Sequence, residues 1–329
     1  MGASLLTGNR DGFDMDKRTA DIRVLASHET HYSIALRNIV SGQTAPDAET
    51  DRRVADLLDF VQSRPLRIEP VVGAFADGRL VCACACVESP GRAALVHVPP
   101  DRVARRHGDV LAAALRTLLE RAWANALVLV QALVPPESRN LEDVLSHAGF
   151  RFLAELVYQE RAADAPPGSL RVRGDLTFVS YSARTHELFL DALNLSYVDS
   201  LDCPDLTGLR TTEDVLAAHK AAGRHDPECW FVAGDSQGPV GVILLSKVLS
   251  RPAFEVVYMG VAPRARGQGV GDALLDKAMK QCVCRDATRL ALAVDSANTP
   301  AVCFYARWGF NEIARRRAWI AARADAGGR

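Results

Sequence analysis

The chain has 329 residues, of which 48% are hydrophobic and 24% are charged, and its formal net charge is −1. This length suits two domains, and this balance of apolar and charged residues is typical of globular rather than disordered proteins. The small net charge provides no field that would attract nucleic acid or an anionic membrane, and no apolar run is long enough to span a bilayer. The sequence therefore predicts no nucleic-acid partner and no membrane partner.

The first 17 residues contain no apolar segment of the kind found in secretory signals, so residues 1–17 are predicted to be a disordered lead. Without an export signal, we expect the eight cysteines to be reduced thiols in a cytoplasmic protein. Cys82, Cys84 and Cys86 alternate along an expected strand and therefore share one face. They are either small buried core residues or a thiolate metal site, and the pattern favours the core. No metal site is predicted.

The first half, residues 18–161, shows alternating strand and helix patterns. The expected elements, in chain order, are strands at 71–76, 80–87 and 95–98, a helix with an apolar stripe at 110–119, a strand at 128–133, a helix at 141–147 and a strand at 152–158. Small residues, two prolines and a glycine at 162–169 then predict a linker.

The second half, residues 170–322, repeats this order before a short tail at 323–329. The expected elements are a strand at 176–181, helices at 186–197 and 212–222, a hairpin of strands at 230–233 and 240–245, a strand at 254–261, a helix after a glycine-rich loop, a strand at 290–294, a helix at 300–307 and a strand at 312–321. An ungapped shift of 163 pairs Pro100 with Pro263, and a shift of 160 pairs Gly149 with Gly309. Agreement in both residues and order indicates duplication rather than chance similarity.

The strongest motif is the glycine-rich loop, which reads Val-Ala-Pro-Arg-Ala-Arg-Gly-Gln-Gly-Val-Gly from position 261. Glycine adopts backbone angles that other residues avoid, so Gly267, Gly269 and Gly271 let N–H groups converge beside a helix N-terminus. Arg264 and Arg266 can add charge-assisted bonds to a phosphate. The spacing matches neither the dinucleotide-binding nor the nucleoside-triphosphatase fingerprint. The remaining alternative is a turn without a ligand.

Two signatures resemble the GNAT superfamily of acyl-CoA-dependent N-acyltransferases. Arg266-Gly267-Gln268-Gly269-Val270-Gly271 resembles the family's Arg/Gln-x-x-Gly-x-Gly/Ala loop. Asn298 to Phe310 resembles its second signature, which has an asparagine, an alanine, a Phe-Tyr pair and Gly-Phe. The resemblance covers essentially all of the second half. It implies an α/β (α+β) fold of two tandem GNAT-like domains, each with a mixed, mostly antiparallel central sheet flanked by helices.

The resemblance also implies that the second half is an N-acetyltransferase that uses acetyl-CoA. The cosubstrate is expected to lie where the strands near 254–261 and 290–294 part, with its pyrophosphate on the glycine loop. The residues expected to bind it are Met259, Gly260, Val261, Arg264, Arg266, Gly267, Gln268, Gly269, Val270, Gly271 and Asn298. Backbone N–H groups near Gly260 and Val261 are candidates to hold the thioester oxygen.

Amide formation needs a base for the amine and an acid for the leaving thiolate. Glu255 begins the strand that leads into the loop, and several family members have a catalytic glutamate at this position; the alternative is an exposed edge glutamate. Tyr305 matches the family tyrosine near the CoA sulfur and is the expected acid; the alternative is a core aromatic residue. The acceptor is expected to be a primary amine of a small molecule or peptide.

The segment at 196–206 lines the acceptor pocket in the family. Its Asp199, Asp202 and Asp205 either hold a cationic amine or form a solvated acidic turn. The protein is expected to be a monomer or homodimer. The alternative function is a non-catalytic acyl-CoA-binding sensor, and the combination of Glu255 and Tyr305 favours the enzyme.

The first half is expected to be a degenerate, inactive copy. The shift of 163 places Arg92 at the position of Glu255, and the shift of 160 places Leu145 at Tyr305. The loop is lost as well, because Val103, Ala104 and Arg106 take the positions of Arg266, Gly267 and Gly269. Two such domains with an active second copy resemble the architecture of mycothiol synthases, which does not fix the acceptor.

Overall fold

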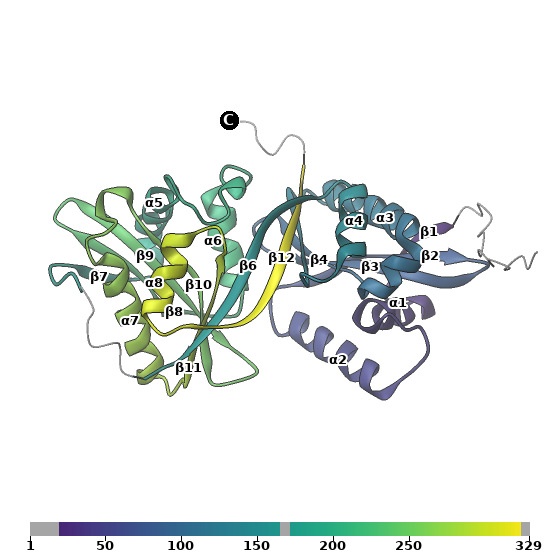
Figure 1. Cartoon of the computed structure of the whole chain (residues 1–329), viewed down its shortest axis with the longest axis horizontal. Coiled ribbons are helices and arrows are strands. Elements are labelled where there is room, and N and C mark those ends of the chain that lie inside the picture. The colour runs from purple at the N-terminus through teal and green to yellow at the C-terminus, as the bar shows by residue number, and fades with distance from the viewer. Residues whose placement is uncertain (1–19, 165–171, 324–329) are drawn as a thin grey trace, which may run out of the picture.

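The structure is a computed structural model that describes residues 20–164 and 172–323. Twelve strands form one sheet in the order β1-β2-β3-β4-β5-β12-β6-β11-β10-β9-β8-β7. Among these strands only the pairs β4–β5 and β10–β11 are parallel. Helices flank the sheet in both halves (Figure 1), so the predicted fold class is confirmed. The predicted lead, and most of the predicted linker and tail, lie outside the described residues.

The two halves contain the same order of elements from β2 and β8 onward. The N-terminal half consists of β1 (Asp21–Leu25), α1 (Thr30–Ser41), α2 (Ala48–Gln62), β2 (Arg67–Ala76), β3 (Arg79–Ser89), β4 (Ala93–His97), α3 (Asp101–Ala124), β5 (Leu129–Val134), α4 (Arg139–His147) and β6 (Arg151–Ala162). The C-terminal half consists of β7 (Thr177–Ser180), α5 (His186–Tyr197), α6 (Thr212–Ala221), β8 (Arg224–Asp235), β9 (Gly238–Val248), β10 (Ala253–Val261), α7 (Val270–Cys284), β11 (Arg289–Asp295), α8 (Thr299–Arg307) and β12 (Asn311–Ala322). The predicted elements are confirmed in type, whereas β1, α1 and α2 were not predicted.

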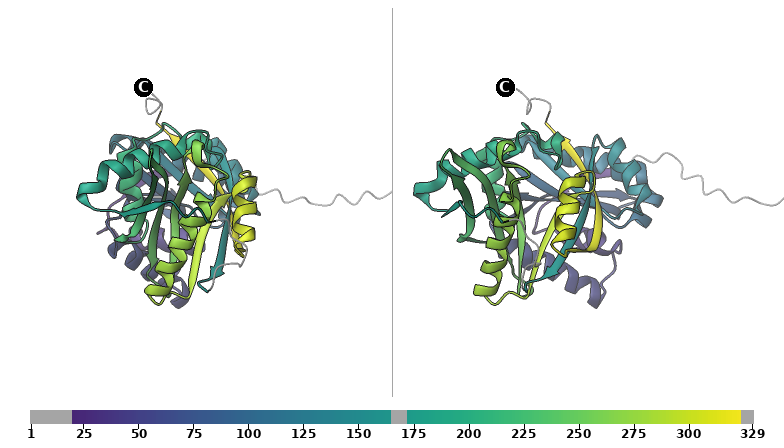
Figure 2. Two further views of the ribbon diagram at one scale, coloured as in Figure 1. Left: turned by 90° about the vertical axis from the view of Figure 1, so that its left-hand side faces the viewer. Right: turned by 60° about the vertical axis from the view of Figure 1, so that its left-hand side comes forward.

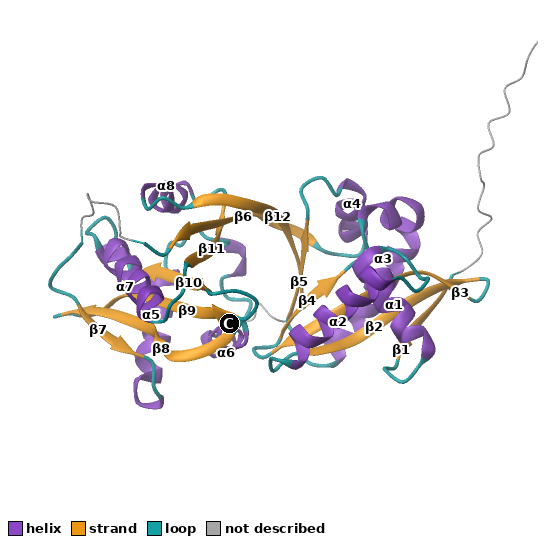
Figure 3. Ribbon diagram, turned by 90° about the horizontal axis from the view of Figure 1, so that it is seen from below, coloured by secondary structure: helices purple, strands orange, loops and turns teal. Residues whose placement is uncertain are grey.

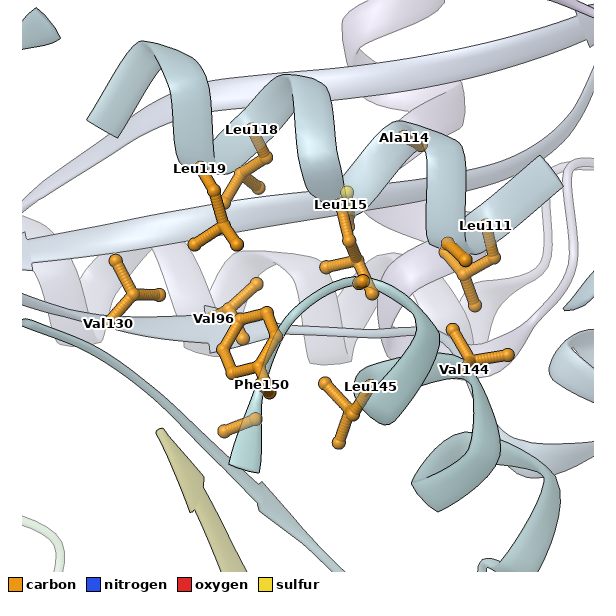
Figure 4. Packing of buried hydrophobic residues seen from close by; sticks show 14 of the residues in the cluster. Val96, Leu111, Ala114, Leu115, Leu118, Leu119, Val130, Val144, Leu145 and Phe150 are labelled. Carbon is orange, nitrogen blue, oxygen red and sulfur yellow. The ribbon is translucent and has the colours of Figure 1, made fainter. Parts of the chain in front are cut away.

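Helix α3 buries an apolar stripe against the N-terminal part of the sheet. Leu111 and Leu115 are fully buried, and they belong to one core with Val96 of β4 and Phe150 (Figure 4). Helices α1 and α2 cover the opposite face, around Leu36. Burying each such leucine contributes about 1.5–3 kcal/mol. No helix in the described part of the chain is long and apolar enough to cross a membrane.

The alternating cysteines of β3 belong to this core. Cys82, Cys84 and Cys86 are fully buried in the layer that contains α3. Burial raises the pKa of each thiol, so all three stay protonated at neutral pH. They act as small apolar residues, which is the first of the two interpretations above.

In the C-terminal half, the sheet separates two apolar layers. Helices α7 and α8 pack on one face around Leu274 and Trp308, and α5 and α6 pack on the other around Trp230. Side chains alternate along a strand, so Phe254 faces α7 while Glu255 faces the side of α5 and α6. This alternation places the predicted base on the face covered by α5 and α6, and the segment at 196–206 leads from the first of these helices toward the second.

The last strand of each half is exchanged between the halves. Strand β12 pairs with β5 and strand β6 pairs with β11, both antiparallel. The two exchanged strands also pair with each other and bridge the halves (Figures 2 and 3). Two similar sheets are thereby joined into one, a feature that the sequence did not predict. The domain limits at 161 and 170 stay a prediction.

Candidate functional site

The parallel strands β10 and β11 part after a short paired stretch. Their ladder joins Ala253–Val256 to Arg289–Leu292 and ends there, although both strands continue. On its other edge, the register of β10 with β9 shifts between Val256 and Tyr258, which marks a β-bulge. Beyond the bulge, the facing edges of β10 and β11 form an opening in the sheet. It lies where the family resemblance placed acyl-CoA.

The glycine-rich loop follows β10 directly and ends at a helix N-terminus. Gly267 and Gly269 have φ angles of 74° and 82°, in the left-handed region that favours glycine. Gly269 precedes α7 without a side-chain cap, and the N–H of Ala273 donates to its carbonyl. The N–H groups of Val270 and Gly271 therefore have no acceptor within the helix. Such free donors, together with the helix dipole, suit a pyrophosphate.

The two loop arginines hold the loop against its neighbours. Arg264 donates to the carboxylate of Asp235 at 2.9 and 3.0 Å, and these bonds keep the pKa of that carboxyl well below its usual range. Arg266 donates to main-chain carbonyls at the end of α5, those of Ser196 at 3.3 Å and Asp199 at 3.1 Å. Their predicted contact with phosphate stays a prediction, whereas their role in fixing the loop was missed.

The other predicted cosubstrate ligands lie at the end of β10, in the loop and at the start of α8. They are Met259, Gly260, Val261, Gln268 and Asn298. The β10 residues are half-buried and come after the point at which the strands part. Asn298 precedes α8, and its side-chain oxygen accepts from the N–H of Ala301 at 3.2 Å. Asn298 therefore fixes the start of the helix that carries Tyr305.

Glu255 is half-buried on the last paired stretch of β10. Burial raises the pKa of its carboxyl, and Arg251 and Arg64 oppose this rise. Arg64 lies just after α2, so a cation of the N-terminal half acts on the predicted base. The phenol of Tyr158, on the exchanged strand β6, has a pKa raised by burial and, to a smaller extent, by Glu255. The surroundings of Glu255 thus come from both halves.

Tyr305 lies on the other face of the sheet, in the layer of α7 and α8. Its ring is 5.2 Å from that of Phe304 and 5.6 Å from that of Phe310. Burial raises the pKa of its hydroxyl above 10.0, and the nearby Asp202 and Tyr258 add to the rise. The ring is therefore a core residue, while the hydroxyl stays protonated at neutral pH and lies near residues that border the opening.

The three predicted acceptor aspartates have different partners. Asp205 forms an ion pair with Arg151 of β6. The carboxylate of Asp202 accepts from the N–H of Asp295, at the end of β11, at 3.1 Å. The main-chain carbonyl of Asp199 accepts from the second loop arginine. The segment is tied at three points rather than folded around one acidic pocket, and acceptor binding by these residues stays a prediction.

Sequence reasoning missed a polar cluster beside the opening. The hydroxyls of Tyr258 on β10 and Ser196 are 2.8 Å apart. The ring of Tyr258 lies 5.3 Å from that of Tyr197 and 5.6 Å from that of His219. Burial lowers the pKa of His219 to about 4, so its imidazole is neutral at physiological pH. The bulge in β10 decides which face Tyr258 occupies, and the sequence pattern gave no sign of that bulge.

The N-terminal half lacks both predicted catalytic side chains. Strands β4 and β5 pair in the same register as β10 and β11 at a shift of 160, so Leu95, and not Arg92, takes the position of Glu255. The ungapped shift of 163 was wrong here because the connection from strand to helix is shorter in this half. Leu145, at the position of Tyr305, is fully buried in the core.

The glycine loop is also replaced in the N-terminal half. Helix α3 begins with an extra turn that ends at a kink at His107, where the C-terminal half has its loop. Val103 and Ala104 of this turn are buried in the core. Arg106 takes the position of Gly269 under the shift of 163. A helical turn with inward side chains leaves no glycine cradle for a phosphate.

Known proteins share this sequence pattern. Residues 195–310 match the Acetyltransferase (GNAT) family. A mycothiol acetyltransferase of Beutenbergia cavernae is 32% identical over 108 residues, which are 32% of this chain and 36% of that protein. A mycothiol acetyltransferase of Streptomyces griseus subsp. griseus is 29% identical over 232 residues, which are 68% of this chain and 69% of that protein.

A solved structure shares the fold over nearly the whole chain. The GCN5-related N-acetyltransferase from Sphaerobacter thermophilus aligns with 92% of this chain and 95% of its own, at a TM-score of 0.58 and 19% identity. The likeness therefore extends through both halves and is not confined to residues 195–310. Residues 195–310 therefore carry a domain of the GNAT acetyltransferase family, and the order of its elements is repeated in the N-terminal half.

Proposed function

We propose that the protein is an N-acetyltransferase that moves the acetyl group of acetyl-CoA to a primary amine of a small molecule or peptide by direct attack. The observation that carries the proposal is the opening between β10 and β11, which is followed by the uncapped N-terminus of α7. The unpaired edges of the strands suit the amide groups of the CoA arm, and the free N–H groups of α7 suit its pyrophosphate.

Glu255 and Tyr305 supply the proton transfers of this reaction. Bound acetyl-CoA supplies the thioester carbon, at which a C–N bond forms while the C–S bond breaks. The Glu255 carboxylate takes a proton from the ammonium form of the acceptor, so that the neutral amine attacks, and its raised pKa makes it a stronger base than an exposed glutamate. The Tyr305 hydroxyl gives its proton to the departing sulfur. Strand N–H groups near Gly260 hold the oxygen as it gains charge.

The alternative is an acyl-CoA-binding sensor that performs no chemistry. Thiol release from acetyl-CoA should be measured against a panel of primary amines, with binding measured by calorimetry. The relatives' name puts amines of mycothiol chemistry on that panel. An enzyme gives amine-dependent thiol release that is lost in Glu255→Gln. Binding of acetyl-CoA without release under any amine would support the sensor instead.

A further inference from the structure

The N-terminal half contacts the C-terminal half where α6 begins. Arg92, in the turn between β3 and β4, donates to the carboxylate of Asp214 through Nη2 at 2.6 Å and Nε at 3.1 Å. Arg210, just before α6, donates to the main-chain carbonyl of Gly91 at 3.2 Å. A side chain at Gly91 would collide with the main-chain carbonyl of Asp214. The main chains of the two halves are therefore in direct contact at this turn.

The segment before α6, residues 198–211, has two further contacts with the N-terminal half and its exchanged strands. Its Asp205 pairs with Arg151 of β6. Its Leu206 and Leu209 pack against an apolar cluster formed by both halves, whose buried members are Ala93, Val128, Leu129 and Ile320. We call residues 198–211 the acceptor segment. Main-chain, ionic and apolar contacts all hold it to the N-terminal half.

The first half of the acceptor segment is hydrogen-bonded to residues that border the opening. The N–H of Cys203 donates to Asp295 at 3.3 Å, and Asp202 accepts from the N–H of Asp295 at 3.1 Å. Asp295 ends β11, one of the two strands that part. Arg266 of the glycine loop donates to the carbonyl of Asp199 at 3.1 Å. A displacement of the acceptor segment would therefore reach the opening through at least two sets of hydrogen bonds.

We infer that the N-terminal half positions the acceptor amine. Arg151 holds Asp205 within the acceptor segment, and Arg92 holds Asp214 in the first turn of α6, directly after that segment. The inference rests on the proposed function, because it concerns the amine of that reaction. Both ion pairs are partly exposed, and such pairs typically contribute no more than about 1 kcal/mol to stability. Their loss should leave the fold intact. A displaced substrate, in contrast, can slow a reaction by about a hundredfold for a shift of 1 Å.

The test compares Arg92→Ala, Arg92→Lys and the double variant Arg92→Ala/Arg151→Ala with the wild type. Arg53→Ala is the matched control, since Arg53 forms an exposed ion pair with Glu49 within α2. Three quantities are measured: kcat and KM for the amine, the Kd of acetyl-CoA, and hydrogen exchange of residues 198–211. The double variant should lose about tenfold or more in kcat/KM for the amine. Exchange of the segment should be faster, the Kd of acetyl-CoA should change much less than kcat/KM for the amine, and Arg92→Lys should retain more activity than Arg92→Ala.

Two outcomes with an active wild type would overturn the positioning role. One is unchanged exchange of the acceptor segment in the double variant, and the other is faster exchange with unchanged kinetics for the amine. A wild type that releases no thiol with any amine would instead overturn the proposed function, and the inference with it. Gly91→Ala provides a second route to the same contact, because it displaces Asp214 without removing a charge. It should also lower kcat/KM for the amine.

Discussion

The pKa of Glu255 determines the pH range in which this side chain acts as a base. Burial raises that pKa, and the proton-accepting form exists only above it, so activity should fall as the pH drops through the raised value. We expect Glu255→Gln to lower kcat about a hundredfold at neutral pH. The loss should shrink at high pH, where more of the amine is already unprotonated. Steady-state kinetics across pH test this, and a loss that is constant with pH would indicate a structural role.

Arg64 provides an independent test of the same carboxylate. Its positive charge lowers the pKa of Glu255, so its removal should raise that pKa. For Arg64→Ala, we expect the acid limb of the kcat/KM profile to move to higher pH while the plateau above it is kept. Arg52→Ala, on the exposed side of α2, is the control. A limb at an unchanged pH would show that Arg64 does not act on the base.

Tyr305 is expected to act in the transition state rather than in binding. Its raised pKa keeps the hydroxyl protonated across the neutral range, so it can donate throughout. We expect Tyr305→Phe to lower kcat about tenfold to a hundredfold, with the Kd of acetyl-CoA unchanged. The ring, which packs against Phe304 and Phe310, is kept in this variant. Equal turnover in the two proteins across pH would remove Tyr305 from the mechanism.

Among the elements, the glycine loop and α7 can be tested together. Gly269→Glu puts a side chain at a φ of 82° and a negative charge beside the N–H groups of α7, where an anion is expected. We expect the Kd of acetyl-CoA to rise by tenfold or more, about 1.4 kcal/mol or more. Gly78→Glu is the matched control, with a φ of 75° in an exposed turn of the N-terminal half. Unchanged affinity in Gly269→Glu would refute the loop assignment.

The sequence predicts an element well when its apolar residues are regular and its ends carry turn residues. Strand β10, the glycine loop and α7 meet both conditions. Helix α2 carries a shorter stripe, in which Val54, Leu58 and Val61 recur at helical spacing among charged residues, and it was missed. The bulge after Val256 was equally hidden, since an extra residue in a strand changes no residue type. Tyr258 and its polar cluster were missed for this reason.

For the molecule as a whole, the sequence indicated a duplication but not how the copies join. Strands β6 and β12 are the last strands of their halves and correspond to each other in the duplication. The sequence pattern therefore allows either strand to pair with β5 or with β11. A choice between such partners depends on long-range packing, which one sequence does not reveal. The shift of 163 failed near Arg92 for a similar reason, because only pairing registers locate a change in loop length. Arg92, first interpreted as a lost base, instead contacts Asp214 across the halves.

The last prediction is that the full chain has one active site. The exchanged strands make an isolated half a poor test, because the sheet of each half is completed by a strand from the other half. That strand would be missing from an isolated half. We therefore expect the double variant Glu255→Gln/Tyr305→Phe in the full chain to lose nearly all acetyl transfer. It should still bind acetyl-CoA and keep its circular dichroism spectrum, which control for folding. In the N-terminal half, Leu95 and Leu145 take the two catalytic positions and can neither accept nor donate a proton. Substantial amine-dependent turnover in the folded double variant would show that the first half is catalytic after all.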